Sequence, residues 1–160
     1  MFVKKLFSKV YAFWILLAEG VGALSGWLTR KGMKRYAAQA VKPPLTPPEM
    51  LFPIVWAVLY LLMGIGAARV YQTPASNARS RALGVFLVQL GVNFLWSIIF
   101  FNLQTYGFAL LWLAALWGLV LWMSVLFYRV DKPAGLMQIP YLLWLSFAAY
   151  LNFGVWMLNR

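Results

Sequence analysis

The sequence contains no cysteine and no histidine, and only three of its 160 residues carry a carboxylate. These absences exclude disulfides, thiolate nucleophiles, imidazole bases and the usual zinc ligands. The acids Glu19, Glu49 and Asp131 are too few and too widely separated to indicate an acid–base pair. We therefore predict no metal site, no cofactor and no conventional enzyme activity.

Charge of either sign is scarce, since 11% of the residues are charged and 64% are hydrophobic. A typical soluble domain is about half apolar and about a quarter charged. The composition therefore predicts an integral membrane protein, and the length fits a single domain over residues 1–160.

Apolar runs separated by polar segments predict where the chain crosses the membrane. Because bilayer hydrocarbon is about 30 Å thick, a spanning helix needs about 20 apolar residues. Five such runs occur, at about 10–28, 51–68, 82–101, 108–127 and 139–158. We predict an all-α fold, an integral membrane bundle of five transmembrane helices whose short connections make successive helices antiparallel neighbours.

Basic residues dominate the few charges, with 14 Lys and Arg and a formal net charge of +11. In a soluble protein this balance would suggest a nucleic acid partner. Here the basic residues fall almost entirely between the apolar runs, where they serve as headgroup anchors and topology signals. We expect a lipid membrane and no nucleic acid as partner, although a basic surface also suits an anionic ligand.

The distribution of these basic residues predicts the orientation of the bundle. The side that holds the N-terminus carries eight of them: Lys4, Lys5, Lys9, Arg69, Arg79, Arg81, Arg129 and Lys132. The opposite side carries six: Arg30, Lys31, Lys34, Arg35, Lys42 and Arg160. Because short cytoplasmic loops are enriched in Lys and Arg, we expect a cytoplasmic N-terminus. The long basic loop 30–48 would then face outward, against the usual trend.

Polar side chains inside the apolar runs indicate where the interior of the bundle lies. In the third run, Gln89, Asn93 and Ser97 recur every four residues and form one stripe, with Trp96 on an adjoining face. Such a stripe either links helices by hydrogen bonds or contacts a ligand, and the sequence leaves both interpretations open.

Aromatic residues form similar faces on two other predicted helices. Trp56 and Tyr60 share a face of the second helix, and Trp144 and Ala148 share a face of the fifth. Each face alone is typical of packing. Together with Trp96 and the polar stripe, they would suit a cavity for a flat, largely apolar ligand with a few polar groups.

Glu19 lies near the middle of the first predicted helix, where a charged carboxylate is costly. It is either a neutral acid bonded to an amide such as Gln89 or Asn93, or a proton-coupling site in a transporter. Small residues are also paired at helical spacing, in Gly22–Gly26 and Gly64–Ala68, and these pairs are candidate dimer seams.

The longest connection, 30–48, ends in a proline-rich segment that cannot continue a helix. Together with three stretches inside the predicted helices it resembles the tryptophan-rich sensory protein and translocator protein family, also called TspO/MBR or peripheral benzodiazepine receptor. The matching stretches are KPPLTPP at 42–48, WAVLY at 56–60, NFLWS at 93–97 and PYLLWLSFAAYLN at 140–152.

This resemblance implies a five-helix bundle, often a homodimer, in a bacterial cell membrane, with a ligand cavity near the first loop. Members of the family bind porphyrins such as protoporphyrin IX. Carried over by motif, the cavity residues are Trp56, Tyr60, Asn93, Trp96, Ser97, Trp144 and Ala148. The loop would act as a lid, with Lys42, Pro43, Pro44, Pro47 and Pro48 as its motif residues. Some bacterial relatives promote light-dependent porphyrin breakdown through tryptophans that match Trp56 and Trp144.

The chain also departs from the family pattern. Leu45 stands where the proline-rich motif usually has Trp. Tyr36 stands roughly where the family usually has a second Trp. Some members bind cholesterol, but a sterol motif needs a basic residue within about five positions after its Tyr. After Tyr150 the first basic residue is Arg160, so sterol binding is not predicted.

The leading hypothesis is a membrane binding protein for porphyrins, other tetrapyrroles and similar flat hydrophobic ligands, acting in sensing, sequestration or transport. The alternatives are a light-dependent porphyrin-degrading protein and a small-molecule transporter.

Overall fold

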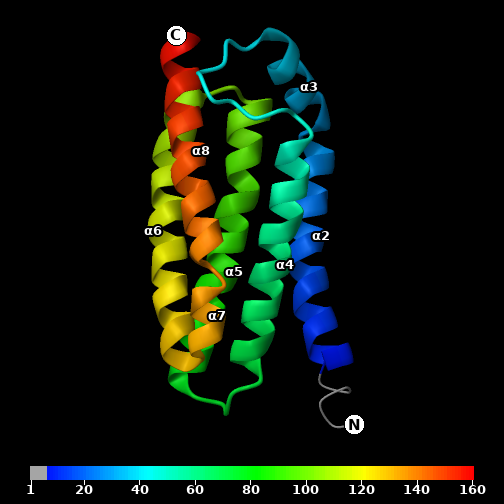
Figure 1. The fold of residues 1–160 in the computed structure, drawn as a ribbon, viewed down its shortest axis with the longest axis vertical. Coiled ribbons are helices and arrows are strands. Elements are labelled where there is room, and N and C mark those ends of the chain that lie inside the picture. The colour runs from blue at the N-terminus through cyan, green and yellow to red at the C-terminus, as the bar shows by residue number, and fades with distance from the viewer. Residues whose placement is uncertain (1–6) are drawn as a thin grey trace.

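Five long helices run side by side along the molecule in the computed structural model, which describes residues 7–160 (Figure 1). They are α2 (Ala12–Leu28), α4 (Leu51–Tyr71), α5 (Asn77–Ser97), α6 (Tyr106–Val130) and α8 (Ile139–Leu158). π-Helical turns η1 (Phe7–Tyr11) and η2 (Ile98–Asn102) precede α2 and follow α5, and two short helices, α3 (Arg30–Gln39) and α7 (Lys132–Leu136), lie at the ends of the bundle.

All five long helices are long and apolar enough to cross a membrane. The predicted all-α bundle of five membrane helices is therefore confirmed. Lys4 and Lys5, which contribute to the orientation prediction, lie outside the described residues.

Helices begin outside the predicted apolar runs where a polar residue caps their N-terminus. α5 begins at Asn77 rather than near 82, since the Ser76 side chain accepts a hydrogen bond from the backbone N–H of Arg79 at 3.0 Å. α6 continues to Val130, where Asp131 takes up an extended conformation and caps α7 through the N–H of Ala134.

The predicted loop 30–48 contains a helix that the sequence pattern does not indicate. α3 follows α2 after a break at Thr29, and its buried Gly32 packs against the backbone of Phe101. A Cβ atom at position 32 would lie 2.7 Å from that carbonyl oxygen, so only glycine allows this close approach. The pairing with η2 is a tertiary contact and leaves no periodic signal in the sequence.

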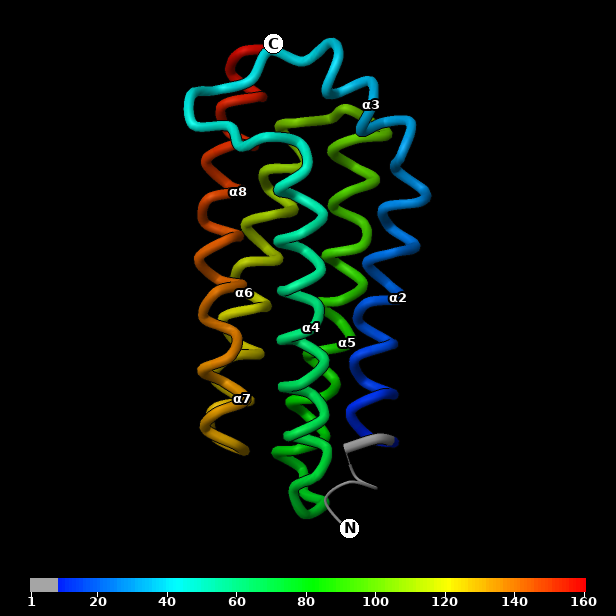
Figure 2. The backbone as a smooth tube through the Cα atoms, turned by 45° about the vertical axis from the view of Figure 1, so that its right-hand side comes forward, coloured from blue at the N-terminus to red at the C-terminus, as the bar shows by residue number. Residues whose placement is uncertain are grey.

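The helices form a bundle in which α4 and α8 share one face, with α5 and α6 behind them and α2 beside α4 (Figures 1 and 2). α3 and the C-terminus lie at one end, and α7 and the α4–α5 connection lie at the other.

The small residues proposed as dimer seams instead pack α2 against α4. Gly22 faces the ring of Tyr60, and a Cβ atom on Gly64 would lie 2.5 Å from the Cα atom of Ile15. Ala68 is fully buried. Except for Gly26, around which the described chain leaves open space, these residues therefore serve packing inside one chain.

Candidate ligand-binding site

An apolar groove of about 440 Å³ lies between α4 and α8. Small-molecule sites usually measure about 300–1,000 Å³, so this volume suits a small molecule. Its lining residues come from both helices: Ile54, Val55, Val58 and Leu59 from α4, and Pro140, Leu143, Trp144 and Phe147 from α8. Of the residues predicted for the cavity, Trp144 lines this groove.

Aromatic contacts cross from α4 to α8 along the groove. The ring of Trp144 meets Phe52 edge-on, with centroids 5.8 Å apart. Trp56 lies 5.6 Å from Tyr60 and 6.3 Å from Tyr141, which belongs to α8. Trp56 and Trp144 thus stand on opposing helices, as the motif comparison implies, and Tyr141 joins them as a residue not included in the predicted site.

A buried hydrogen-bond network holds three helices together beside these rings. The hydroxyl of Tyr60 donates to Oδ1 of Asn93 at 3.1 Å, and Nδ2 of Asn93 donates to the hydroxyl of Tyr141 at 2.5 Å. Tyr141 in turn donates to Oε1 of Gln89 at 2.7 Å. Because all four side chains are buried and bonded to one another, the interhelical interpretation of the polar stripe is favoured for Asn93 and Gln89.

Three other predicted cavity residues lie outside the groove lining. Trp96 is buried, stacks on Phe100 with centroids 5.0 Å apart, and donates from Nε1 to Oδ1 of Asn152 at 3.2 Å. Ser97 is half-buried at the end of α5, and Ala148 is buried on α8 next to Phe147. Motif spacing alone does not distinguish these positions from those that border the groove.

Lys42, the first residue of the proline-rich motif, closes the C-terminus of α3. Its Nζ donates to the carbonyl oxygens of Ala37 and Ala40 at 3.0 and 3.2 Å, and lies 5.1 Å from the ring centroid of Tyr36. A cation that satisfies the last carbonyls of a helix stabilises its end. Lys42 therefore shapes the lid loop, defined here as residues 30–48.

The proline-rich part of the lid loop is fastened to α8 (Figure 2). Tyr150 donates its hydroxyl to the carbonyl of Pro44 at 2.7 Å, and buried Pro43 packs directly on Gly154. Asn159 bonds both the N–H and the carbonyl of Val41, at 2.9 and 2.7 Å. Of the other two motif prolines, Pro47 is half-buried and Pro48 is exposed just before α4.

The two departures from the family pattern have different structural consequences. Leu45 adopts a φ of 70°, which non-glycine residues rarely adopt, and its side chain is 80% exposed at the tip of the lid loop. Tyr36 contacts the rings of Phe100 and Phe101, so an aromatic contact persists there. Burial, with a smaller contribution from Tyr106, raises the pKa of Tyr36 to about 12, which keeps its hydroxyl protonated at neutral pH.

Glu19 is partly buried on α2, and the structure does not pair it with Gln89 or Asn93. Asn93 bonds Tyr60 of α4 and Tyr141 of α8 instead, and Gln89 accepts from Tyr141. The hypothesis of a Glu19–amide hydrogen bond is therefore not supported.

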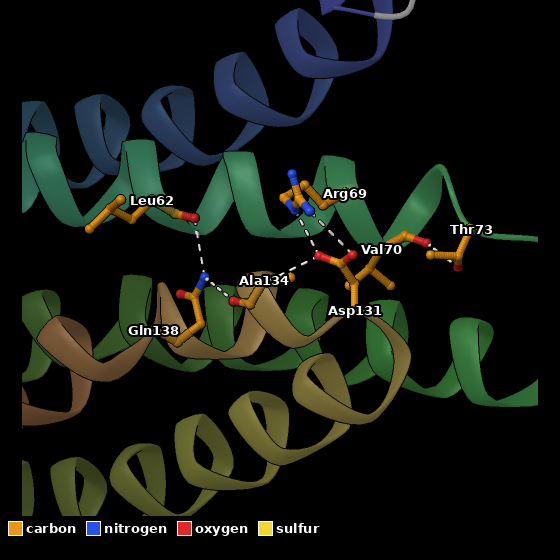
Figure 3. Close-up of polar contacts among 7 residues, drawn as sticks. All are labelled: Leu62, Arg69, Val70, Thr73, Asp131, Ala134 and Gln138. Carbon is orange, nitrogen blue, oxygen red and sulfur yellow. Dashed lines mark hydrogen bonds and ion pairs between the residues drawn. The ribbon is translucent and has the colours of Figure 1, made fainter.

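A second polar cluster, which the sequence pattern did not reveal, joins α4 to α7 and α8 at the end opposite the lid loop (Figure 3). Arg69 and Asp131 form an ion pair with Nε and Oδ2 2.7 Å apart. The buried amide of Gln138 donates to the carbonyl oxygens of Leu62 and Ala134 at 3.1 and 3.2 Å. The Asp131-Lys132-Pro133 sequence, an N-cap followed by a first-turn proline, was the available signal.

A family model of the TspO/MBR family matches residues 14–157, which is most of the chain. The chain belongs to the TspO/MBR family. The predicted resemblance is thus confirmed.

Relatives in the TspO/MBR family come from bacteria, archaea and mammals. Tryptophan-rich protein TspO of Chlorobaculum tepidum is 38% identical over 144 residues, which cover 89% of this chain and 91% of the relative. Protein CrtK of Rhodobacter capsulatus is 44% identical over 119 residues, or 74% of each chain. The human Translocator protein is 32% identical over 148 residues, covering 90% of this chain and 87% of the relative. Membership supports a sensory or translocator role in a membrane.

Proposed function

We propose that this TspO/MBR protein binds porphyrins, other tetrapyrroles and similar flat hydrophobic ligands in the groove between α4 and α8. Binding would serve sensing, sequestration or transport of the ligand. The observation that carries the proposal is an apolar groove of about 440 Å³ bordered by the indole of Trp144 and the ring of Phe147.

The chemistry of the lining suits a flat macrocycle. Aromatic rings pack with large contact areas in offset or edge-on arrangements, and Phe52 and Trp144 already adopt an edge-on geometry at 68°. The aliphatic side chains on the α4 wall add dispersion contacts without polar groups that would need partners. Relatives named Tryptophan-rich sensory protein and Translocator protein support a sensory or translocator role in a membrane.

A titration with protoporphyrin IX tests this proposal. The protein is placed in lipid nanodiscs, and quenching of its tryptophan fluorescence is followed as porphyrin is added. We expect saturable quenching, with an affinity at least about tenfold weaker in Trp144→Ala because a stacking wall of the groove is lost. Quenching that does not saturate, or an affinity unchanged by Trp144→Ala, would contradict the proposal.

Trp122→Ala is the matched control for this titration. Trp122 is 50% exposed on α6 and does not line the groove. The same residue type is thus removed from a site that the ligand should not touch. We expect the total quenching to fall while the affinity stays as in the unmodified protein.

A second candidate function is light-dependent degradation of the bound porphyrin. It is favoured by the positions of Trp144 at the groove and Trp56 against Tyr141, on two helices that face the same ligand site. The reaction would require light and molecular oxygen.

We further propose a bacterial cell membrane location, a cytoplasmic N-terminus and a homodimer. Because the chain has no cysteine, single reporters can be placed at Ala75, between α4 and α5, and at Ala38 in the lid loop. A membrane-impermeant thiol reagent added to intact cells should label Ala38→Cys and spare Ala75→Cys. The reverse labelling pattern would show that the N-terminus lies outside the cell.

Chemical crosslinking in native membranes tests the homodimer.

A further inference from the structure

The mouth of the groove opens on the outer surface of the bundle. Three residues that line it are exposed there: Ile54 by 59%, Val58 by 50% and Leu143 by 66%. All three lie within membrane-spanning segments, in Leu51–Tyr71 and Lys132–Leu158. The groove therefore faces bilayer hydrocarbon.

Above the groove, the lid loop runs from its contacts with α8 to the start of α4 (Figure 1). Any opening there must separate Tyr150 from the Pro44 carbonyl and Asn159 from both backbone groups of Val41. It must also move Pro43 off Gly154, where a Cβ atom on the glycine would lie 2.5 Å from the proline ring. Three hydrogen bonds and a tight apolar contact would be lost together.

Below the groove, the polar cluster of Figure 3 links α4 to α7 and α8. The ion pair between Arg69 and Asp131 joins α4 to the start of α7. Gln138, fully buried at the start of α8, bonds the carbonyl of Leu62 on α4. α4 and α8 are thus fastened at both ends of the groove.

Between these two fastenings, the ring pairs Phe52–Trp144 and Trp56–Tyr141 connect the facing helices. The side chains at the edge of the mouth, such as Val58 and Leu143, are aliphatic, so moving them aside breaks no side-chain hydrogen bond. Opening the lid loop would break several hydrogen bonds and one tight contact together, whereas apolar side chains at the mouth exchange protein contacts for lipid contacts at little cost.

We propose that ligands enter and leave the groove sideways from the bilayer, between α4 and α8, while the lid loop stays closed. This inference rests on the proposed function and specifies its substrate class: flat, largely apolar molecules that have already partitioned into the membrane. Water-soluble molecules are excluded, because the open approach to the groove passes through hydrocarbon.

A crosslinking experiment tests the route. Because the chain has no cysteine of its own, only the introduced thiols react. A Val58→Cys/Leu143→Cys variant places one thiol on each wall of the groove mouth. A Val41→Cys/Asn159→Cys variant locks the lid loop to α8. Ala114→Cys/Ala149→Cys is the control, because both positions line a separate groove of about 370 Å³ between α6 and α8.

Each variant is loaded with protoporphyrin IX in nanodiscs and then bridged with a short bifunctional methanethiosulfonate reagent. Release to empty acceptor vesicles is followed by recovery of tryptophan fluorescence, before and after a reductant opens the bridge. We expect the mouth bridge to slow release by at least about tenfold and reduction to restore it. The lid bridge and the α6–α8 bridge should leave the release rate unchanged.

The possible outcomes separate the route from the function. Trapping by the lid bridge, or by neither bridge, would overturn lateral entry. A mouth bridge that expels the ligand would also overturn it, since a bridge across an entry route must retain what is inside. Absence of saturable porphyrin binding before any bridging would instead remove the proposed function itself.

Discussion

Asn93 connects three helices through two buried hydrogen bonds, to Tyr60 of α4 and Tyr141 of α8. Its position in a motif shared with the family made it a candidate ligand contact. In the structure its side chain is 1% exposed and occupied by protein partners. Its influence on a ligand would therefore pass through Tyr60 and Tyr141, which hold Trp56 in place.

Asn93→Leu should reduce the stability of the protein more than its affinity for porphyrin. The substitution leaves the Tyr60 hydroxyl without its acceptor in a buried site, at a cost of about 1–2 kcal/mol. The midpoint of thermal unfolding in detergent measures this loss, with Asn77→Leu, an exposed position on the same helix, as control. A porphyrin affinity that falls as far as in Trp144→Ala, at unchanged stability, would show that Asn93 contacts the ligand directly.

At the scale of single elements, the packing of α2 against α4 depends on the absence of a side chain at Gly64. A Cβ atom there would lie 2.5 Å from Cα and 2.9 Å from the backbone nitrogen of Ile15, so the two helix backbones must separate to admit it. On α5, by contrast, Gly84 is exposed, and a Cβ atom added to it would meet no atom of the described chain within 4 Å.

Gly64→Ala should destabilise the protein by about 1–3 kcal/mol, because overpacking forces a backbone shift. Gly84→Ala should be neutral or stabilising by up to about 1 kcal/mol, because alanine favours the helix. Thermal unfolding of both variants gives the comparison. Equal effects would mean that α2 and α4 do not pack closely at Gly64.

Asp131 combines two roles at the start of α7, and two substitutions separate them. Asn retains an N-cap side chain but loses the charge facing Arg69, whereas Ala loses both. Because the ion pair is partly exposed, we expect Asp131→Asn to cost at most about 1 kcal/mol. Asp131→Ala should cost about 1 kcal/mol more. Thermal unfolding at low and high salt checks the order, and a larger loss in Asn than in Ala would contradict it.

The same elements show what the sequence predicts and what it leaves out. Apolar run length gives the five spans, since the bilayer fixes the length of a crossing helix. Ser76 and Asp131 cap the starts of α5 and α7 outside those runs, because a cap depends on one polar residue rather than on hydropathy. α3 is absent from the prediction because its contact with η2 is formed only in the folded chain.

For the site, the sequence predicts some of the residues but not the contacts between them. Trp56 and Trp144 follow from helical spacing and motif, and the structure places them on facing helices. Helical spacing does not show which helix faces pack against each other. The hydrogen bonds of Tyr141 with Asn93 and Gln89 were therefore not predicted. Trp96 shows the same limit, because its indole is engaged by Asn152 instead of the groove.

At the scale of the whole molecule, the bundle is fastened at both ends and apolar between them. The lid loop and the Arg69–Asp131 cluster carry polar bonds at the two ends of the groove. Between these fastenings, aliphatic and aromatic side chains line the groove, and Trp144 contributes the indole in that lining. A porphyrin held there would meet little water and would contact a readily oxidised side chain.

This arrangement gives the prediction for photochemistry. The proposed light-dependent function would have an excited porphyrin react with nearby indoles under oxygen. Trp56→Phe/Trp144→Phe retains most of the apolar volume and removes both indoles. Under illumination we expect porphyrin loss, followed by absorbance, to be at least about fivefold slower in this variant at equal ligand occupancy. Trp122→Phe, on the exposed side of α6, should leave the rate unchanged, and dark samples should keep their porphyrin. Equal rates in all illuminated samples would assign the light reaction to the porphyrin alone and leave the protein a binding function.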